Sequence, residues 1–289
     1  MFIVLLAGAL VTKTGAGRGC GDDWPLCNGK FIPAYTLESI IEYNHRAVTG
    51  VVGILVLITF IAIYKSYSRR SEAFVYASGV LFFTVLQAIL GAMAVKWEQS
   101  SAVMALHFGF SMLALTFTLL LVARIWRTQE KANNPVPVRT GFMKLVWVTT
   151  IYSYIVVYIG AYVRHTDSSG GCTGWPLCNN EWMPELSGPT GIAFLHRAAA
   201  LLLLVMVGWM SAQGLGSNRN AVEIRRLSAV SITLVMLQIF SGGFVVATMN
   251  MANVYLFASM LHTTIIAALF AVLSYMSIRV WQLRERGPQ

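Results

Sequence analysis

The sequence is poor in charged residues. Asp, Glu, Lys and Arg together make up 11% of its 289 residues, whereas hydrophobic residues make up 56%. Soluble domains carry about 25% charged residues, so this composition excludes an ordinary soluble domain and favours a protein of the lipid bilayer. Lys and Arg number 21 against 12 Asp and Glu. Because these basic residues form no single patch, the excess does not indicate nucleic-acid binding.

Cysteine is also scarce. The four cysteines form two close pairs, Cys20 with Cys27 and Cys172 with Cys178, in loops that we expect outside the membrane. The outer side of a bacterial-type membrane is oxidising, so the spacing predicts two local disulfides. For the first pair, a structural staple and a redox-active pair that exchanges electrons with a partner thiol both stay open.

Long hydrophobic runs, in contrast, fill the chain. Crossing the hydrocarbon core takes about 20 apolar residues in a helix, and seven stretches reach that length: 40–64, 74–95, 101–126, 142–163, 190–212, 227–248 and 254–279. An eighth, residues 1–11, would rise only about 17 Å, so we expect a truncated helix or one that starts upstream. The predicted fold is an all-α integral membrane protein, with eight transmembrane helices forming two pseudo-symmetric four-helix bundles. Its parts are an N-terminal half, 1–126, a cytoplasmic linker, 127–144, and a C-terminal half, 145–289.

Basic residues predict the orientation. Five lie in the loops on the cysteine side: Lys13, Arg18, Lys30, Lys96 and Arg164. Fourteen lie in the opposite loops and the C-terminus: Lys65, Arg69, Arg70, Arg124, Arg127, Lys131, Arg139, Lys144, Arg219, Arg225, Arg226, Arg279, Arg284 and Arg286. By the positive-inside rule we expect a multi-pass protein of the cell membrane, with both termini cytoplasmic and the cysteine loops outside.

One pattern of residues occurs twice. The first copy reads Gly8-Ala9, Cys20, Trp24-Pro25-Leu26-Cys27, His45-Arg46-Ala47, Leu86-Gln87, Gly91 and His107. The second copy reads Gly160-Ala161, Cys172, Trp175-Pro176-Leu177-Cys178, His196-Arg197-Ala198, Leu237-Gln238, Gly242 and His262. The offset is 152 positions at the first cysteine, 151 from the tryptophan to the glycine and 155 at the last histidine. A duplication that keeps both histidines predicts two similar ligand sites.

These histidines lie at matched depths. His45, His107, His196 and His262 are expected about 8–12 Å below the outer ends of four helices, where ionisable side chains usually mark a functional site. Two histidines from neighbouring helices suit axial ligation of a haem iron, and copper is a lesser alternative. In each half an arginine follows the first histidine, where it would face haem propionates or reach lipid headgroups.

The two halves differ at one carboxylate. Glu42 precedes His45 by three residues and therefore shares a helix face with it, whereas Ala193 occupies the matching position before His196. This difference predicts that chemistry takes place on a tetrapyrrole in the first half, with Glu42 handling a proton or stabilising a developing charge. The second half would hold a haem that passes electrons. The alternative is that Glu42 is only a carboxylate favoured by the helix dipole.

The chain resembles the haem A synthase family over essentially its whole length, in the bacterial form with cysteine pairs in both outer loops. The resemblance rests on Gly8-Ala9-Leu10-Val11-Thr12-Lys13-Thr14-Gly15, Cys20, Trp24-Pro25-Leu26-Cys27, Glu42-Tyr43-Asn44-His45-Arg46, Ala105-Leu106-His107-Phe108-Gly109, Gly160-Ala161-Tyr162-Val163-Arg164-His165-Thr166 and His196-Arg197-Ala198-Ala199. It implies oxidation of a pyrrole-ring methyl group of haem O to a formyl group, which gives haem A for cytochrome oxidase.

The resemblance also implies roles for single residues. His196 and His262 would ligate a haem b cofactor, His45 and His107 would hold the substrate haem O, Glu42 would be the catalytic carboxylate, and Cys20–Cys27 the disulfide beside it. Expected partners are the haem O synthase (protohaem farnesyltransferase) and a membrane electron acceptor, and a homo-oligomer is compatible with the sequence.

Three other functions compete with this hypothesis. A di-haem b-type cytochrome that exchanges electrons with quinol explains the four histidines but not the difference between Glu42 and Ala193. A membrane thiol oxidoreductase would use the cysteine pairs and no haem. A transporter is disfavoured, because two halves of four helices each run in parallel rather than inverted.

Overall fold

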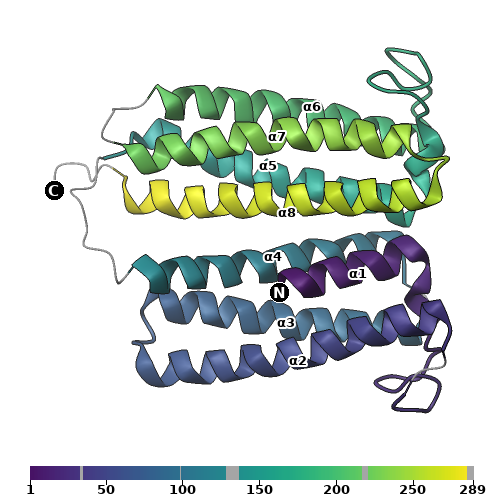
Figure 1. The fold of residues 1–289 in the computed structure, drawn as a ribbon. Coiled ribbons are helices and arrows are strands. Elements are labelled where there is room, and N and C mark those ends of the chain that lie inside the picture. The colour runs from purple at the N-terminus through teal and green to yellow at the C-terminus, as the bar shows by residue number, and fades with distance from the viewer. Residues whose placement is uncertain (33–34, 98, 128–136, 217–220, 285–289) are drawn as a thin grey trace. The chain divides into compact units, whose positions relative to one another are not determined.

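The computed structural model describes residues 1–32, 35–97, 99–127, 137–216 and 221–284 (Figure 1). Within these ranges the regular structure is helical, with β-bridges only as isolated pairs. The elements are α1 (Phe2–Thr14), η1 (Ala16–Arg18), α2 (Leu37–Ser66), α3 (Glu72–Lys96), α4 (Ser101–Arg127), α5 (Thr140–His165), η2 (Ser168–Gly171), α6 (Gly188–Leu215), α7 (Val222–Ala247) and α8 (Ala252–Gln282). The all-α prediction is confirmed.

Helices α2 to α8 are long and apolar enough to cross a membrane, and they coincide with the seven long segments predicted from hydropathy. Helix α5 begins at Thr140, inside the predicted linker 127–144. Helix α1 has 13 residues, which rise about 20 Å against a hydrocarbon core of about 30 Å. The described residues therefore contain seven helices of spanning length and one shorter apolar helix.

Local signals in the sequence set the helix ends. The side chains of Thr36 and Ser71 accept hydrogen bonds from the main-chain N–H groups of Ser39 and Phe74, which caps α2 and α3. At the end of α1, Gly15 has a φ of 72°, the left-handed conformation that closes a helix and favours glycine.

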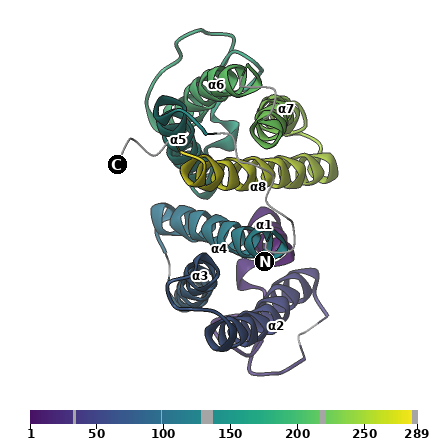
Figure 2. The same cartoon turned by 90° about the vertical axis from the view of Figure 1, so that its left-hand side faces the viewer.

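The chain divides into two compact units, Met1–Gln129 and Glu130–Gln289. In the first unit each helix contacts its sequence neighbours, and α1 also contacts α4. The second unit repeats this scheme, with α5 also contacting α8. Figure 2 shows the four helices of each unit nearly end-on. Within each unit, then, the first and last helices close a ring of contacts.

Small and polar residues hold the helices of the second unit together. The hydroxyls of Thr150 on α5 and Ser277 on α8 lie 2.8 Å apart, and both side chains are buried. A Cβ on Gly214 of α6 would lie 1.9 Å from the Oγ of Ser228 on α7, so the absence of a side chain lets these helices approach closely. Such contacts are typical of helix packing in lipid, where apolar burial alone gives little drive for association.

An ion pair repeats in both units, between the start of the third helix and the end of the fourth. In the first unit Arg124 Nε lies 2.9 Å from Glu72 Oε2, with both side chains about one-third exposed. In the second unit Arg279 donates through Nε and Nη2 to the two oxygens of Glu223, each at 2.8 Å, and Arg279 is buried. This pair ties the last helix of each unit to its neighbour.

The surface of α2 is apolar. Val51, Ile54, Leu55 and Ile58 are each more than half exposed. Lipid stabilises such a surface, because the exposed side chains then contact hydrocarbon rather than water.

Candidate functional site

Both predicted disulfides are present. Cys20–Cys27 and Cys172–Cys178 close loops of similar size, with Cα–Cα distances of 4.3 and 4.7 Å, and all four cysteines are buried. Each loop also contains a cis proline, Pro25 in the first and Pro176 in the second. The duplicated sequence pattern thus corresponds to two loops of similar conformation.

Each disulfide loop crosses the first turn of the following long helix at a glycine. A Cβ on Gly19 would lie 2.4 Å from the carbonyl carbon of Glu38 in α2, and a Cβ on Gly171 would lie 2.4 Å from that of Pro189 in α6. Real Cβ atoms do not come that close to main-chain atoms, so only glycine fits at either crossing. Ser39 also donates a hydrogen bond from its hydroxyl to the Gly19 carbonyl, which fixes the loop on the helix.

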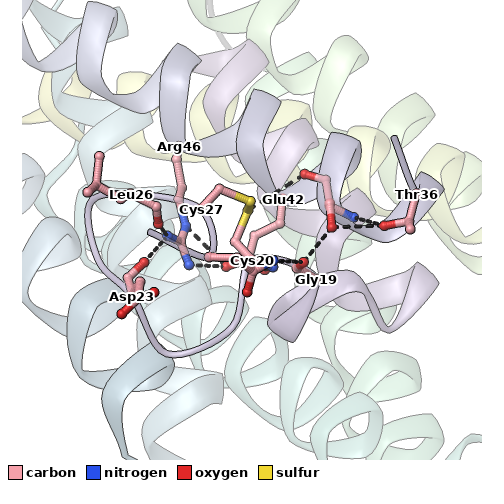
Figure 3. The surroundings of a disulfide bond; sticks show 10 residues. Gly19, Cys20, Asp23, Leu26, Cys27, Thr36, Glu42 and Arg46 are labelled. Carbon is pink, nitrogen blue, oxygen red and sulfur yellow. Dashed lines mark hydrogen bonds and ion pairs between the residues drawn. A yellow bond between two sulfur atoms is a disulfide. The ribbon is translucent and has the colours of Figure 1, made fainter. Parts of the chain in front are cut away.

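Glu42 lies on α2 beneath the first disulfide loop and is buried, with 3% of its surface exposed. Its Oε2 accepts a hydrogen bond of 2.8 Å from the main-chain N–H of Cys20. Its Oε1 accepts from Nε of Arg46 at 3.1 Å and also from Nη2 of the same arginine. Figure 3 shows Glu42 beside the first disulfide, with its carboxylate joined by dashed lines to the guanidinium group of Arg46. Both of its oxygens are therefore used as acceptors of N–H hydrogen bonds.

Arg46 joins this carboxylate to the rest of the loop. Besides contacting Glu42, it donates through Nη1 to the carbonyl oxygens of Asp23, at 2.7 Å, and Leu26 (Figure 3). Its side chain is 12% exposed. A planar guanidinium with several N–H donors suits this task, because it can hold a carboxylate and main-chain carbonyls at once.

The second half keeps the arginine without the carboxylate. Arg197 donates through Nη1 to the carbonyl of Leu177, which matches Leu26, and through Nη2 to the carbonyl of Cys172, both at 2.8 Å. Ala193 is buried beside that disulfide. The arginines were expected to face propionates or lipid headgroups, but in the structure they bind the cysteine loops. Glu42 is thus an added group between a loop and an arginine that both halves share.

The four histidines lie near the starts of α2, α4, α6 and α8. His45 and His196 are each the ninth residue of their helix, His107 is the seventh and His262 the eleventh. At 1.5 Å per residue these positions lie about 9–15 Å from the helix starts, slightly deeper than predicted because α2, α6 and α8 begin earlier. That His45 pairs with His107, and His196 with His262, across each unit stays a prediction.

Each histidine ring faces a glycine on the preceding helix. A Cβ built on that glycine would approach the ring Cε1 to 3.2 Å at Gly8 and His45, 3.8 Å at Gly91 and His107, 2.8 Å at Gly160 and His196, and 3.4 Å at Gly242 and His262. These glycines belong to the repeated pattern, but the pattern by itself offers no reason for them. The structure supplies it: they make room for imidazoles.

The histidine environments fit a haem held by two imidazoles. The Nδ1 atoms of His45 and His196 are buried and have no hydrogen-bond partner among the described residues. A buried polar atom without a hydrogen-bond partner destabilises the fold unless a bound group or a water molecule supplies the missing interaction. Buried imidazole nitrogens without a protein partner in both units are compatible with axial ligation of a haem iron.

Comparisons with known proteins identify the family of this chain. The model of a family described as cytochrome oxidase assembly protein (COX15-CtaA) matches residues 34–274. The heme A synthase of Symbiobacterium thermophilum is 39% identical over 283 residues, which cover 96% of this chain and 90% of the relative. That of Alkalihalophilus pseudofirmus is 38% identical over 279 residues, covering 96% and 93%. The Bacillus licheniformis protein of the same name is 39% identical over 293 residues, covering 99% and 94%.

Proposed function

Because this chain belongs to the family of cytochrome oxidase assembly proteins, and is similar over nearly its whole length to heme A synthases, we propose that it catalyses the formation of haem A. The reaction is oxidation of haem O, in which the methyl group on one pyrrole ring becomes a formyl group. The similarity to heme A synthases along almost the entire chain carries this proposal.

The two histidine pairs have different tasks in this reaction. His45 and His107 hold the substrate haem O in the N-terminal half, 1–126. His196 and His262 hold a haem b cofactor in the C-terminal half, 145–289, and the buried ring nitrogen of His196, like that of His45, supports a role as a haem ligand. When bound, haem b supplies a one-electron carrier. The chain itself supplies the four imidazoles and the small residues against which they pack.

Glu42 is the catalytic carboxylate. Conversion of a methyl to a formyl group, with the oxygen atom drawn from water, releases electrons to the acceptor and protons to solvent, and an anion near the reacting carbon stabilises positive charge that develops there. The hydrogen bonds from Arg46 and Cys20 occupy both carboxylate oxygens, which supports this electrostatic role over proton transfer. Ala193 at the matching place supports chemistry in the N-terminal half alone.

The same proposal includes the membrane arrangement. The chain forms eight membrane helices in two pseudo-symmetric four-helix bundles, with both termini cytoplasmic and both cysteine loops outside. Helices α2 to α8 cross the bilayer, and α1, whose 13 residues are shorter than the hydrocarbon core is thick, occupies the place of the first helix. Helix α1 contacts α2 and α4 as α5 contacts α6 and α8. These matching contacts support equivalent places for α1 and α5 in the two bundles, although α1 is shorter. The haem O synthase would deliver the substrate, and an electron acceptor in the membrane would remove the electrons.

The di-haem electron-transfer cytochrome is the alternative function. It uses the same four histidines, but it gives no role to the buried carboxylate of Glu42, and the comparisons with heme A synthases do not favour it.

Mass analysis of extracted haems tests the proposal. Membranes that make haem O should contain haem A when they also contain this protein, and Glu42→Gln should stop the product or leave it at the hydroxymethyl stage. The matched control is Glu38→Gln, the same change one helical turn earlier at an exposed position of α2, which should convert haem O normally. Unchanged haem O in the presence of the wild-type protein, with two haems b bound, would establish the cytochrome instead.

A further inference from the structure

His262 is held by two side chains of α7 that the mechanism above does not use. The Oγ of Ser241 lies 2.8 Å from Nδ1 of its ring. The amide nitrogen of Gln238 lies 2.9 Å from Nε2 and 3.2 Å from Nδ1, so its closer contact is with Nε2. Both Ser241 and Gln238 are buried.

These contacts favour one arrangement of the ring proton. When the hydroxyl of Ser241 donates to the main-chain carbonyl of Gln238, at 2.9 Å, its oxygen accepts from the ring and Nδ1 carries the proton. Nε2 then keeps its lone pair, which the Gln238 amide approaches in this structure and which would be open to iron once that amide turns away. This is the tautomer that ligates iron through Nε2, with the other nitrogen fixed by a neighbouring group.

The first half uses the same glutamine differently. Gln87, which matches Gln238, donates to the main-chain carbonyl of His107 at 2.8 Å. The hydroxyl of Ser111 on α4 lies 3.0 Å from Oε1 of Gln87 and also 3.0 Å from the main-chain carbonyl oxygen of His107, and it can donate to either. By the offsets of the repeat, Ser111 corresponds to Ile266 in the second half, and Ser241 corresponds to Leu90 in the first.

The serine beside the glutamine thus lies on a different helix in each unit. In the first unit it is Ser111 on α4, which lies beside both the Gln87 amide and the main-chain carbonyl that this amide binds, and Leu90 has no hydroxyl. In the second unit it lies on α7, where it accepts the ring proton, and the glutamine amide reaches the imidazole instead.

We propose that Ser241 is the positioning residue that fixes His262 as a permanent haem b ligand, and that its replacement by Leu90 in the first half leaves a tetrapyrrole there that exchanges. This inference rests on the proposed function and deepens it, because a substrate haem has to leave after reaction while a cofactor haem has to stay. The neighbour of a metal-ligating histidine typically changes affinity 10–100-fold.

Ser241→Ala in the full-length protein tests the first part, in a His45→Ala background so that bound haem reports the second half. We expect a roughly 10-fold or larger loss of haem affinity and a more positive midpoint potential, because a less basic imidazole donates less to the iron. Ser231→Ala is the matched control, since Ser231 is a buried serine of the same helix whose Oγ has no hydrogen-bond partner among the described residues. Ser241→Thr keeps the hydroxyl and should restore both values, which separates the hydrogen bond from a packing defect.

The double variant Leu90→Ser with Ser111→Ile tests the second part by giving the first half the arrangement of the second. Its tetrapyrrole should be displaced more slowly by added haem O than that of the wild type. The inference is overturned if Ser241→Ala matches Ser231→Ala in haem affinity and potential, or if the double variant exchanges as fast as the wild type. Failure of the proposed function gives a different result, because a wild-type protein without haem in its second half would contradict that function directly.

Discussion

Replacing Arg46 by alanine measures how strongly the buried Glu42 carboxylate depends on its only side-chain cation among the described contacts. In the ion pair the side chains of Arg46 and Glu42 are 12% and 4% exposed. Removing one partner of a buried pair costs about 3–5 kcal/mol, because the other charge is left unpaired. The substitution also removes the hydrogen bonds from Arg46 to the carbonyl oxygens of Asp23 and Leu26, so the first disulfide loop should open more often.

The part of this effect that belongs to the ion pair comes from a second background. In Glu42→Gln the removal of Arg46 leaves a neutral amide, whose loss of a hydrogen-bond partner costs about 1 kcal/mol. Taking the lower value of about 3 kcal/mol for the charged pair, the coupling between the two residues is about 2 kcal/mol. At 1.4 kcal/mol for each factor of ten, this corresponds to a roughly 30-fold difference in loop opening.

The rate of disulfide reduction measures that opening. Cys20 and Cys27 are 0% and 1% exposed, so a small reductant reaches them only when the loop opens. Alkylation of the released thiols and peptide mass analysis give the rate for Cys20–Cys27, and Cys172–Cys178 in the same molecule is the internal reference. Arg46→Ala should accelerate reduction of the first disulfide about 30-fold more in the otherwise wild-type protein than in the Glu42→Gln background. Equal acceleration in both backgrounds, or equal acceleration of both disulfides, would refute the reasoning.

Two further predictions concern the glycine contacts and the ion pairs. Gly160→Ala places a Cβ 2.8 Å from the ring of His196, so it should displace the imidazole and lower the haem content of the purified protein. Gly91→Ala places a Cβ 3.8 Å from the ring of His107, which is an ordinary contact, so this variant should retain its haem. Similar losses in both variants would contradict the steric argument. Glu223→Ala removes the carboxylate from the buried Arg279, which keeps Gln282 as an acceptor, and because Glu223 itself is 37% exposed the change should cost about 2 kcal/mol of unfolding free energy, whereas Glu72→Ala breaks a pair in which both side chains are about one-third exposed and should cost at most about 1 kcal/mol. Unfolding in denaturant compares the two variants, and equal losses would count against the role of burial.

Hydropathy and the repeat were sufficient to predict the helices. An apolar run of about 20 residues in lipid has no alternative to the helix, because every main-chain polar group has to be satisfied within the segment. The prediction was least accurate at the start of α7, where the helix begins at Val222 rather than at 227 because the charged residues Glu223, Arg225 and Arg226 are helical ahead of the apolar run. Hydropathy does not detect a helical turn made of charged residues.

The partners of the site residues were harder to predict. The difference from Ala193 singled out Glu42, and the four-residue spacing of Glu42 and Arg46 in one helix favours the ion pair that the structure shows, but nothing in the local pattern indicated that the carboxylate accepts from the N–H of Cys20. That contact depends on how the loop folds back over α2, which local spacing does not encode. The glycines that face the histidines lie 16 to 37 positions away from them in the chain, so only the packing of neighbouring helices reveals their purpose.

The ring of contacts within each unit has a consequence for synthesis on the ribosome. Because α1 contacts α4 within the first unit, His45 and His107 are both available once the chain has been made as far as Arg127. No residue of the second unit is needed for those contacts, and domains generally fold as units during synthesis. The N-terminal half can therefore complete its helix packing while α5 to α8 are still being translated, and the haem b proposed for the other half would be acquired later.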